Sequence, residues 1–200
     1  MPDTRAPGKL PAPLTDEQIR KATIGEPRRQ DGPIRLAEYD PAWPQQYARE
    51  AERIRAALGD RALRIEHTGS TSVPGLIAKP IIDMLLVVAN SADEPSYVPA
   101  LEARGYVLRI REPDWHEHRL FKGPDININL HVLSEGSAEV QRVLRFRDWL
   151  RTHPDDRDLY AQTKRALASR NWKYVQNYAD AKSEVVEAIL VRAMGSSTPV

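Results

Sequence analysis

The chain has 200 residues, of which 41% are hydrophobic and 28% are charged, and its formal net charge is +1. This composition is typical of one globular domain, and the small net charge gives no general attraction to nucleic acid or to an anionic membrane, so no nucleic-acid partner is evident and no membrane is expected. The lack of cysteine excludes disulfides, thiolate zinc sites and a cysteine nucleophile. No apolar run could span a bilayer, and the N-terminus lacks the apolar core of a secretory signal, so we expect a cytoplasmic protein.

The first 33 residues are rich in proline and charge, which is typical of a flexible arm. Within it, residues 14–22 could form one short helix with Thr15 as its N-cap. The pattern therefore predicts an arm over residues 1–33, a folded domain over residues 34–194 and a frayed tail over residues 195–200.

Hydrophobic periodicity alternates between strands and helices along the first two thirds of the domain. Residues 44–58 favour a helix, because Tyr47, Ala51 and Leu58 lie on one face at helical spacing. A second helix is predicted over residues 93–104. Strands are predicted over residues 34–38, 62–67, 81–88, 106–110, 118–121 and 126–133.

The last third of the sequence has the period of helices. One helix is expected to begin at Ser137, and a second follows with Leu159, Thr163 and Leu167 on its apolar face. A long final helix is expected over residues 175–193. A mixed sheet followed by a C-terminal helical layer is an α+β fold.

Asp83 interrupts the otherwise apolar run of residues 81–88, which is typical of a central strand covered on both faces. Burial of an unpaired carboxylate is costly, so an acid at this position indicates a cation, a metal or a substrate nearby. The competing structural interpretation is a buried acid paired with Lys79 or Arg119. An ion pair inside a core rarely improves stability, which favours a functional role for Asp83.

The loop before this strand, residues 66–80, combines small residues, hydroxyls and backbone donors with Lys79. Gly69, Ser70 and Ser72 are candidates to donate hydrogen bonds to phosphate oxygens, although the two serines could equally cap a helix. A donor-rich loop that leads into a strand with one acid predicts a phosphate site beside a divalent ion.

Five segments of the sequence resemble the GrpB family, and they follow the family's order between about residues 34 and 194. The longest, residues 66–83, is a specific signature. The others are residues 39–43, 118–121, 129–132 and 146–151.

This resemblance implies a core similar to the nucleotidyltransferase superfamily. In that superfamily a Gly-Ser pair follows the first core strand, and three acids on later strands hold two Mg²⁺ ions that bridge a triphosphate. Gly69 and Ser70 match the pair, and Asp83 matches the first acid.

The chain departs from that pattern at the other two acids. Leu85 occupies the second position, and the third falls on Asn129 or His131. One carboxylate does not offset the charge of two magnesium ions, so the resemblance implies either one Mg²⁺ ion or a different reaction. Asp83 would hold that ion, with Glu66 or a histidine as its second ligand.

The first functional hypothesis is a metal-dependent transferase that acts on a nucleotide or another phosphorylated small molecule. This molecule would bind between the sheet and the C-terminal helices. Asp83 and His131 are the candidate catalytic residues, and His131 shares the polar face of its strand with Asn129. The candidate phosphate-binding residues are Gly69, Ser70, Ser72, Lys79, Arg119 and Lys182.

Two other hypotheses stay open. A binding module that recognises a nucleotide or another anion without turnover is favoured by Leu85. A small-molecule tailoring enzyme would use His131 as an acid or a base and would need no nucleotide.

Overall fold

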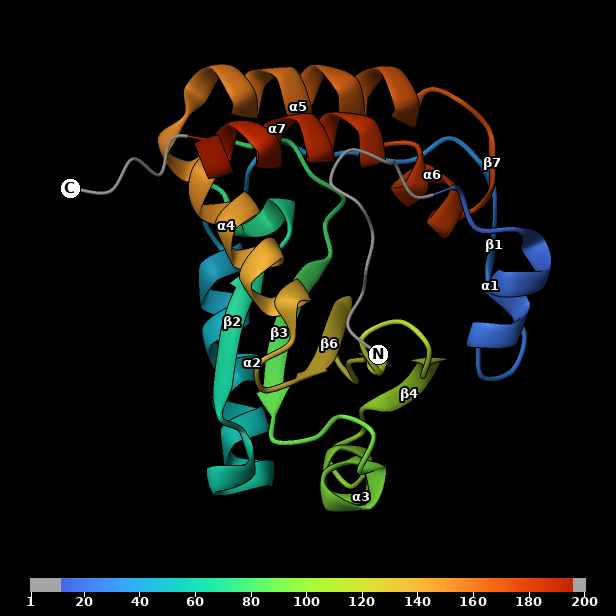
Figure 1. The fold of residues 1–200 in the computed structure, drawn as a ribbon, viewed down its shortest axis with the longest axis vertical. Helices are drawn as coiled ribbons and strands as arrows, with labels where there is room; N and C mark the ends of the chain where they lie inside the picture. The colour runs from blue at the N-terminus through green and yellow to red at the C-terminus, as the bar shows by residue number, and fades with distance from the viewer. Residues whose placement is uncertain (1–11, 196–200) are drawn as a thin grey trace.

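The structure, a computed structural model, describes residues 12–195 and is organised around a five-stranded sheet (Figure 1). The strands are β2 (Arg64–Thr68), β3 (Ile82–Val88), β4 (Val107–Glu112), β5 (His118–Lys122) and β6 (Ile128–Ser134). Their order is β2-β3-β6-β5-β4, in which β3 and β6 are parallel and all other neighbours are antiparallel. The predicted α+β fold with a mixed sheet is confirmed.

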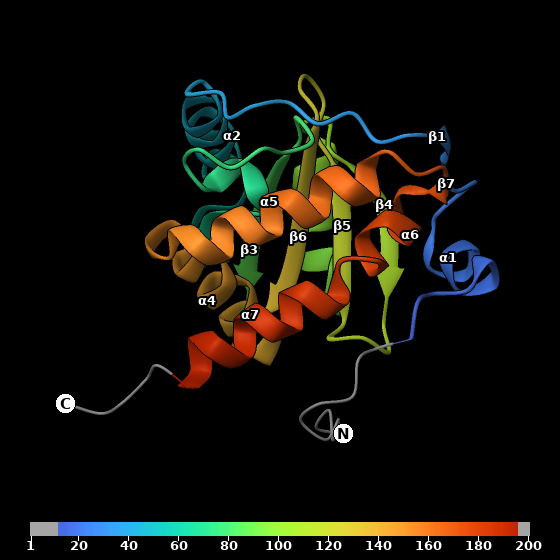
Figure 2. The same ribbon diagram turned by 90° about the horizontal axis from the view of Figure 1, so that it is seen from above.

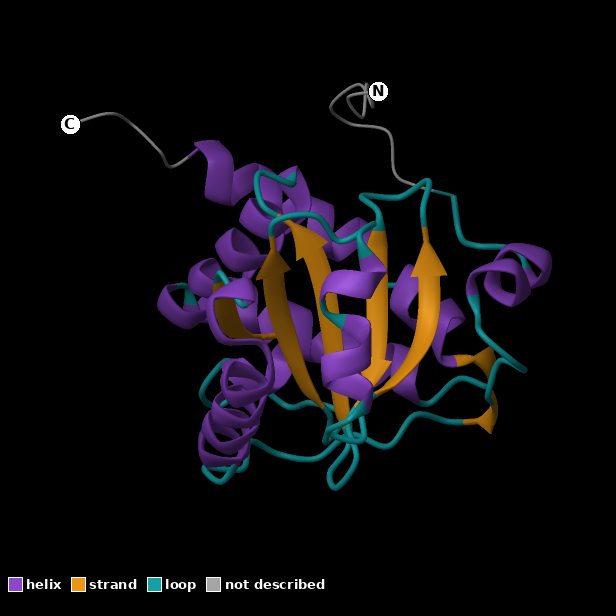
Figure 3. Cartoon of the chain, turned by 90° about the horizontal axis from the view of Figure 1, so that it is seen from below, coloured by secondary structure: helices purple, strands orange, loops and turns teal. Residues whose placement is uncertain are grey.

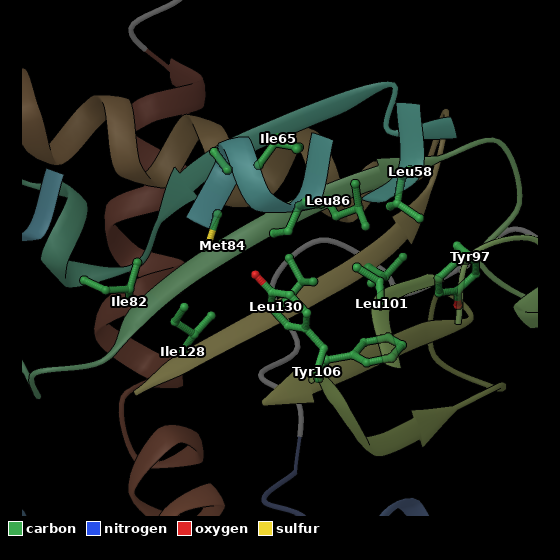
Figure 4. Close-up of a cluster of buried hydrophobic side chains, with 14 of the residues drawn as sticks. Leu58, Ile65, Ile82, Met84, Leu86, Tyr97, Leu101, Tyr106, Ile128 and Leu130 are labelled. Atoms are coloured by element: carbon green, nitrogen blue, oxygen red, sulfur yellow. The ribbon is translucent and has the colours of Figure 1, made fainter. Parts of the chain in front are cut away.

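Two helices, α2 (Trp43–Leu58) and α3 (Val98–Glu102), cover one face of the sheet, which Figure 3 shows from below. Met84, Leu86 and Leu130 alternate along their strands to point to this face, and all three are fully buried. They form one apolar core with Leu58 at the end of α2 (Figure 4). The helical spacing of the apolar residues in α2 produces this packing, as the sequence predicts.

Three helices of the C-terminal third cover the other face, where α5 and α7 cross the strands in Figure 2. Leu85, Val87 and Leu133 point to this face and pack on Val140 and Leu144. These helices are α4 (Ala138–Thr152), α5 (Pro154–Ala168) and α7 (Ser183–Gly195). The predicted C-terminal helical layer is therefore present, and none of the described helices is long and apolar enough to cross a membrane.

The buried face of α5 differs from the predicted face, which is centred on Leu159 and Thr163. Tyr160, Lys164 and Leu167 are buried, whereas Leu159 is 42% exposed. Lys164 therefore points into the protein, on the same face as Tyr160 and Leu167.

The N-terminal segment begins with α1 (Asp16–Ala22), which has the predicted N-cap Thr15 in a complete capping box. Strand β1 (Arg29–Gly32) then pairs with β7 (Trp172–Tyr174) in a separate two-stranded sheet. Residues 29–32 were predicted to belong to the flexible arm, but they are tied to the C-terminal third. Other parts of the predicted arm and tail, residues 1–11 and 196–200, lie outside the described residues.

The predicted strand over residues 34–38 is wrong, because only Ala37 pairs, in an isolated bridge with Ala78. The next pair of this antiparallel ladder would join Arg35 to Pro80, and proline has no N–H to donate. On the other side, the N–H of Leu76 already donates to the carbonyl of Val73.

The predicted long final helix is divided into α6 (Val175–Asp180) and α7. Tyr178 of α6 packs in a cluster with Leu167, whereas Ile189 of α7 packs in another with Leu150. The two halves bury their apolar residues in different clusters, and the turn between them contains Lys182.

Candidate functional site

Asp83 lies near the start of β3 on the face covered by the C-terminal helices, and its side chain is 29% exposed. Its Oδ1 accepts a hydrogen bond of 2.7 Å from Nδ2 of Asn129 and lies 3.9 Å from Nε2 of His131. Burial acts to raise the pKa of Asp83, but His131, Asn129 and Lys182 together hold that pKa below its ordinary value. Asp83 is therefore a carboxylate that water can reach.

Gly69 allows the chain to pass close to this carboxylate. It has φ +64° and ψ −173°, a backbone conformation that is essentially restricted to glycine. A Cβ at this position would lie 2.3 Å from Oδ2 of Asp83. The hydroxyl of Thr68 also donates to the backbone carbonyl of Asp83, at 3.2 Å. The predicted Gly69 thus places the following turn directly on Asp83.

The two predicted serines have different roles in this turn. Oγ of Ser70 accepts a hydrogen bond of 3.0 Å from Nζ of Lys164. Ser72 is buried and its hydroxyl donates to the carbonyl of Gly69, at 2.6 Å. Ser72 therefore braces the turn, and it also lines a separate hollow of about 410 Å³ with Tyr39, Pro44, Tyr47, His67, Pro74 and Arg151.

Lys164 is the functional candidate that the sequence analysis missed. It is only 2% exposed, and besides Ser70 its Nζ donates to the carbonyl of Ile77. Burial lowers the pKa of Lys164 to about 7, and the charges of Lys182 and Arg165 add to this effect. A signal was present in the sequence, since Tyr160, Lys164 and Leu167 recur at helical spacing.

Three more lysines lie in the electrostatic range of Asp83. Burial lowers the pKa of Lys79 and of Lys182 to about 8, and the charge of Asp83 partly opposes the effect on both. Nζ of Lys182 also lies 4.5 Å from the ring centre of Tyr178. Lys122 is more exposed, and it donates to Oδ1 of Asn129, which orients the amide so that Nδ2 faces Asp83.

We name this group of side chains the Asp83 cluster. Its members come from the turn before β3, from the sheet and from the C-terminal helices. They are Ser70, Lys79, Asp83, Lys122, Asn129, His131, Lys164 and Lys182. The carboxylate lies in the electrostatic range of three amines, and Lys164 joins the cluster through Ser70, so the cluster is suited to an anionic ligand.

A hydrogen-bonded chain of two histidines enters the cluster from the sheet. Nδ1 of His118 lies 2.7 Å from Oε2 of Glu112, and Nε2 of His118 lies 3.0 Å from Nδ1 of His131. His118 is buried, which lowers its pKa, although Glu112 opposes the shift. The predicted His131 thus has one direct partner, His118, and Glu112 is linked to it only through that ring; the sequence analysis identified neither contact.

Two predicted site residues lie outside the cluster. Arg119 points to the opposite face of the sheet, where it is buried and bonds to Glu94 at 2.5 Å. Glu66 shares the face of Asp83 but lies opposite Leu85 in the sheet. Its carboxylate accepts hydrogen bonds from Arg147 at 2.6 Å and from Arg64 at 2.8 Å.

These residues do not fit the resident Mg²⁺ site that the resemblance implies. Leu85, at the position of the second acid, is 1% exposed and packs against α4. The second proposed ligand, Glu66, is engaged by two arginines. Across residues 12–195, no group of three histidine, cysteine, aspartate or glutamate side chains could hold a metal ion. The lysines around Asp83 further disfavour a second cation.

Two known proteins place this chain among its relatives. It is 61% identical over 181 residues to a UPF0157 protein of Halalkalibacterium halodurans. The aligned region covers 90% of this chain and 93% of that protein. The crystal structure of conserved protein GrpB from Enterococcus faecalis superimposes with a TM-score of 0.71 at 30% identity, over 80% of this chain and 98% of that one.

A third similarity is much weaker. The Cid1 poly(U) polymerase with bound MgGTP matches 64% of this chain and 45% of that protein, with 10% identity and a TM-score of 0.42. Similarity at this level supports no conclusion about the reaction, and the nucleotidyltransferase-like core stays a prediction. Residues 33–192, in contrast, match the sequence model of the GrpB protein family. The chain therefore belongs to the GrpB family.

Proposed function

We propose that the Asp83 cluster binds a phosphorylated small molecule, with a nucleotide as the first candidate. In this proposal the bound phosphate group is transferred to a hydroxyl or amine acceptor. The observation that carries the proposal is the excess of lysines around one half-buried carboxylate. Phosphate oxygens accept hydrogen bonds from ammonium groups, and such charge-assisted bonds are about twice as strong as neutral ones.

The lysines support this proposal because their charges are poorly balanced within the protein. Within residues 12–195, Lys164 has neutral contacts: the hydroxyl of Ser70, the carbonyl of Ile77 and the ring of Tyr160. Burial lowers the pKa values of Lys79, Lys164 and Lys182. A phosphate bound among these amines would favour their protonated forms. The new charge-assisted contacts would compensate the buried amines, and this compensation would contribute to the binding free energy.

Asp83 has a different role in this proposal from that of a magnesium ligand. Its carboxylate repels phosphate oxygens, so the phosphates would lie on the side of Lys164 and Lys182. Asp83 and His131 then face the acceptor, whose hydroxyl or amine protons they can bind. Any Mg²⁺ that accompanies a nucleotide would be held mainly by the phosphates and water, as is usual for that ion.

Isothermal titration calorimetry tests this proposal. We expect saturable binding of ATP, CTP, GTP or UTP and of inorganic tripolyphosphate, in EDTA as well as in Mg²⁺, and no binding of adenosine. The absence of saturable binding for every phosphate compound would contradict it. Product analysis with the compound that binds then separates a transferase, which forms product, from the non-catalytic binding module.

The variant Asp83→Asn separates an anion site from a metal site. Removal of the one negative charge should tighten the binding of tripolyphosphate measured in EDTA. If Asp83→Asn instead abolishes binding that depends on Mg²⁺, the carboxylate holds a metal and the proposed role of Asp83 is wrong.

A second candidate function is a tailoring enzyme that uses His131 as an acid or base on a substrate without phosphate. The hydrogen-bonded chain of His131, His118 and Glu112 favours it, because such chains orient a catalytic imidazole. This candidate predicts that the protein does not bind tripolyphosphate, so the same titration decides between the two.

A further inference from the structure

His131 of the cluster and its neighbour His118 have a proton arrangement that their partners determine. An ionised carboxylate only accepts hydrogen bonds, so the contact of 2.7 Å with Glu112 requires a proton on Nδ1 of His118. His118 is only 4% exposed, and burial favours its neutral form. Neutral imidazole carries one proton, so Nε2 of His118 has none.

The same reasoning extends to His131. Nε2 of His118 can only accept, and it lies 3.0 Å from Nδ1 of His131, so this Nδ1 must be the donor. Neutral His131 then has no proton on Nε2. Glu112 thus selects the tautomer of His131 across the buried ring of His118, although Glu112 itself makes no contact with the cluster.

The free Nε2 of His131 faces Asp83. The distance between Nε2 and Oδ1 of Asp83 is 3.9 Å, which is too long for a direct hydrogen bond. Two acceptors side by side create a position for a group that brings its own protons, such as a hydroxyl, an amine or water. His131 is 35% exposed and Asp83 is 29% exposed, so such a group can reach them from solvent.

We infer that His131 is the general base of the site, and that His118 and Glu112 are positioning residues that keep its Nε2 free to accept a proton. This inference rests on the proposed function for the identity of the reaction, but its proton arrangement belongs to the ligand-free protein. It also gives a functional role to the buried His118, which is not among the proposed phosphate-binding residues.

The proposed transfer then balances in protons and electrons. The acceptor oxygen forms a bond to phosphorus while its proton moves to Nε2 of His131. The bond from phosphorus to the leaving phosphate breaks, and its electron pair stays on the leaving oxygen. The imidazolium formed at His131 is stabilised by Asp83 at 3.9 Å and by the hydrogen bond to His118.

Nitrogen-15 NMR of the histidine rings in the ligand-free protein tests this assignment. Asp83 faces His131 and Glu112 lies behind His118, while Lys182 and Lys122 interact with Asp83. Spectra are recorded above pH 8, where an imidazole ordinarily carries one proton. We expect a protonated Nδ1 and an unprotonated Nε2 in both His118 and His131. A protonated Nε2 in neutral His131 overturns the inference.

Two variants provide the matched comparison. Glu112→Gln replaces the carboxylate by an amide that can also donate, so the reversed proton arrangement becomes accessible and the signal of His131 Nε2 should shift toward the protonated form. Glu117→Gln, at an exposed position in the turn that follows Glu112, should leave both rings unchanged. An identical His131 spectrum in Glu112→Gln overturns the role of Glu112.

Metal analysis of the purified protein excludes a different explanation for the close histidines. We expect no stoichiometric transition metal, and a bound metal ligated by His118 and His131 would overturn the inference. These measurements need no nucleotide, so a failure of the phosphate titrations and a failure of this assignment can be told apart.

Discussion

Single residues determine the geometry of the Asp83 cluster, and Gly69 is the clearest case. Its Cα faces the carboxylate so closely that a methyl group would overlap Oδ2 and also lie 2.9 Å from Cβ and Cγ of Asp83. The positive φ adds a second restriction on any other residue.

We expect Gly69→Ala to lower the free energy of unfolding by at least about 3 kcal/mol, because backbone strain and steric overlap both oppose it. Gly136→Ala is the matched control, since Gly136 also has a positive φ but has open space at its Cβ position. It should cost only about 1 kcal/mol, the strain alone. Urea denaturation measures both, and equal losses would show that the contact with Asp83 is not tight.

Lys164 makes the stability of the protein depend on pH. Burial lowers its pKa from 10.5 to about 7, whereas an unfolded lysine keeps its proton to about pH 10.4. Between these values the unfolded state binds more protons than the folded state. The free energy of unfolding therefore rises with pH in this window, and the full penalty of the buried charge applies below pH 7.

We expect the wild type to gain about 2 kcal/mol more than Lys164→Met between pH 7 and pH 9, since each full proton difference is worth about 1.4 kcal/mol per pH unit. Urea denaturation at pH 7, 8 and 9 measures the difference between the two proteins. Parallel pH profiles would mean that Lys164 is not buried as a strained amine.

At the scale of elements, Arg147 joins the helical layer to the sheet. It projects from α4, is 7% exposed, and donates to the carboxylate of Glu66 at 2.6 Å and to the carbonyl of His67 at 3.0 Å. Asp148 receives a further hydrogen bond at 2.8 Å. One guanidinium thus holds α4 over the edge strand β2, next to the turn that carries Ser70.

Arg147→Ala should lower the free energy of unfolding by about 3 kcal/mol, because it leaves a buried carbonyl unpaired and Glu66 with fewer donors. Arg145→Ala, an exposed position of the same helix, should change it by less than about 0.5 kcal/mol. Similar losses in the two variants, measured by urea denaturation, would contradict the role given to Arg147.

The features of the fold that could be predicted from the sequence are those determined by residues close together in the chain. The capping residue Thr15 and the apolar face of α2 depend on neighbours within a few residues, and the sequence predicts both. The division of the final helix depends on where Tyr178 and Ile189 find apolar partners, which periodicity does not contain.

The same distinction applies to the site. Asn129 and His131 could be predicted to share one face, because alternation places both on the polar side of β6, and Asp83 stands out as the one acid in an apolar run. Lys164 is indicated only by its helical spacing with Tyr160 and Leu167. The link from Glu112 through His118 to His131 depends on strand pairing that the sequence does not show. Arg119 was wrongly included because its charge was weighed without knowledge of Glu94 on the opposite face.

At the scale of the whole molecule, the sheet and the C-terminal helices produce a half-buried polar region inside an otherwise apolar contact. Leu85 and Val87 seal the interface between the sheet and α4, while Asp83 at the start of the same strand stays partly open to solvent. Lys164 and Lys182 then bring positive charge from the helical layer to this opening. Anion binding would therefore involve both layers and should stabilise the whole fold.

Calorimetry in EDTA, with ATP as the ligand, compares Lys182→Met with Lys21→Met and the wild type. The comparison tests whether the Asp83 cluster is the phosphate-binding site. Lys21 is exposed on α1, on another part of the molecule, and its replacement removes the same charge from the chain. We predict that Lys182→Met weakens ATP binding about tenfold or more, the loss of one charge-assisted contact worth about 1.4 kcal/mol or more, and that Lys21→Met does not. Equal ATP affinities in the two variants would contradict the assignment of the Asp83 cluster as the phosphate-binding site.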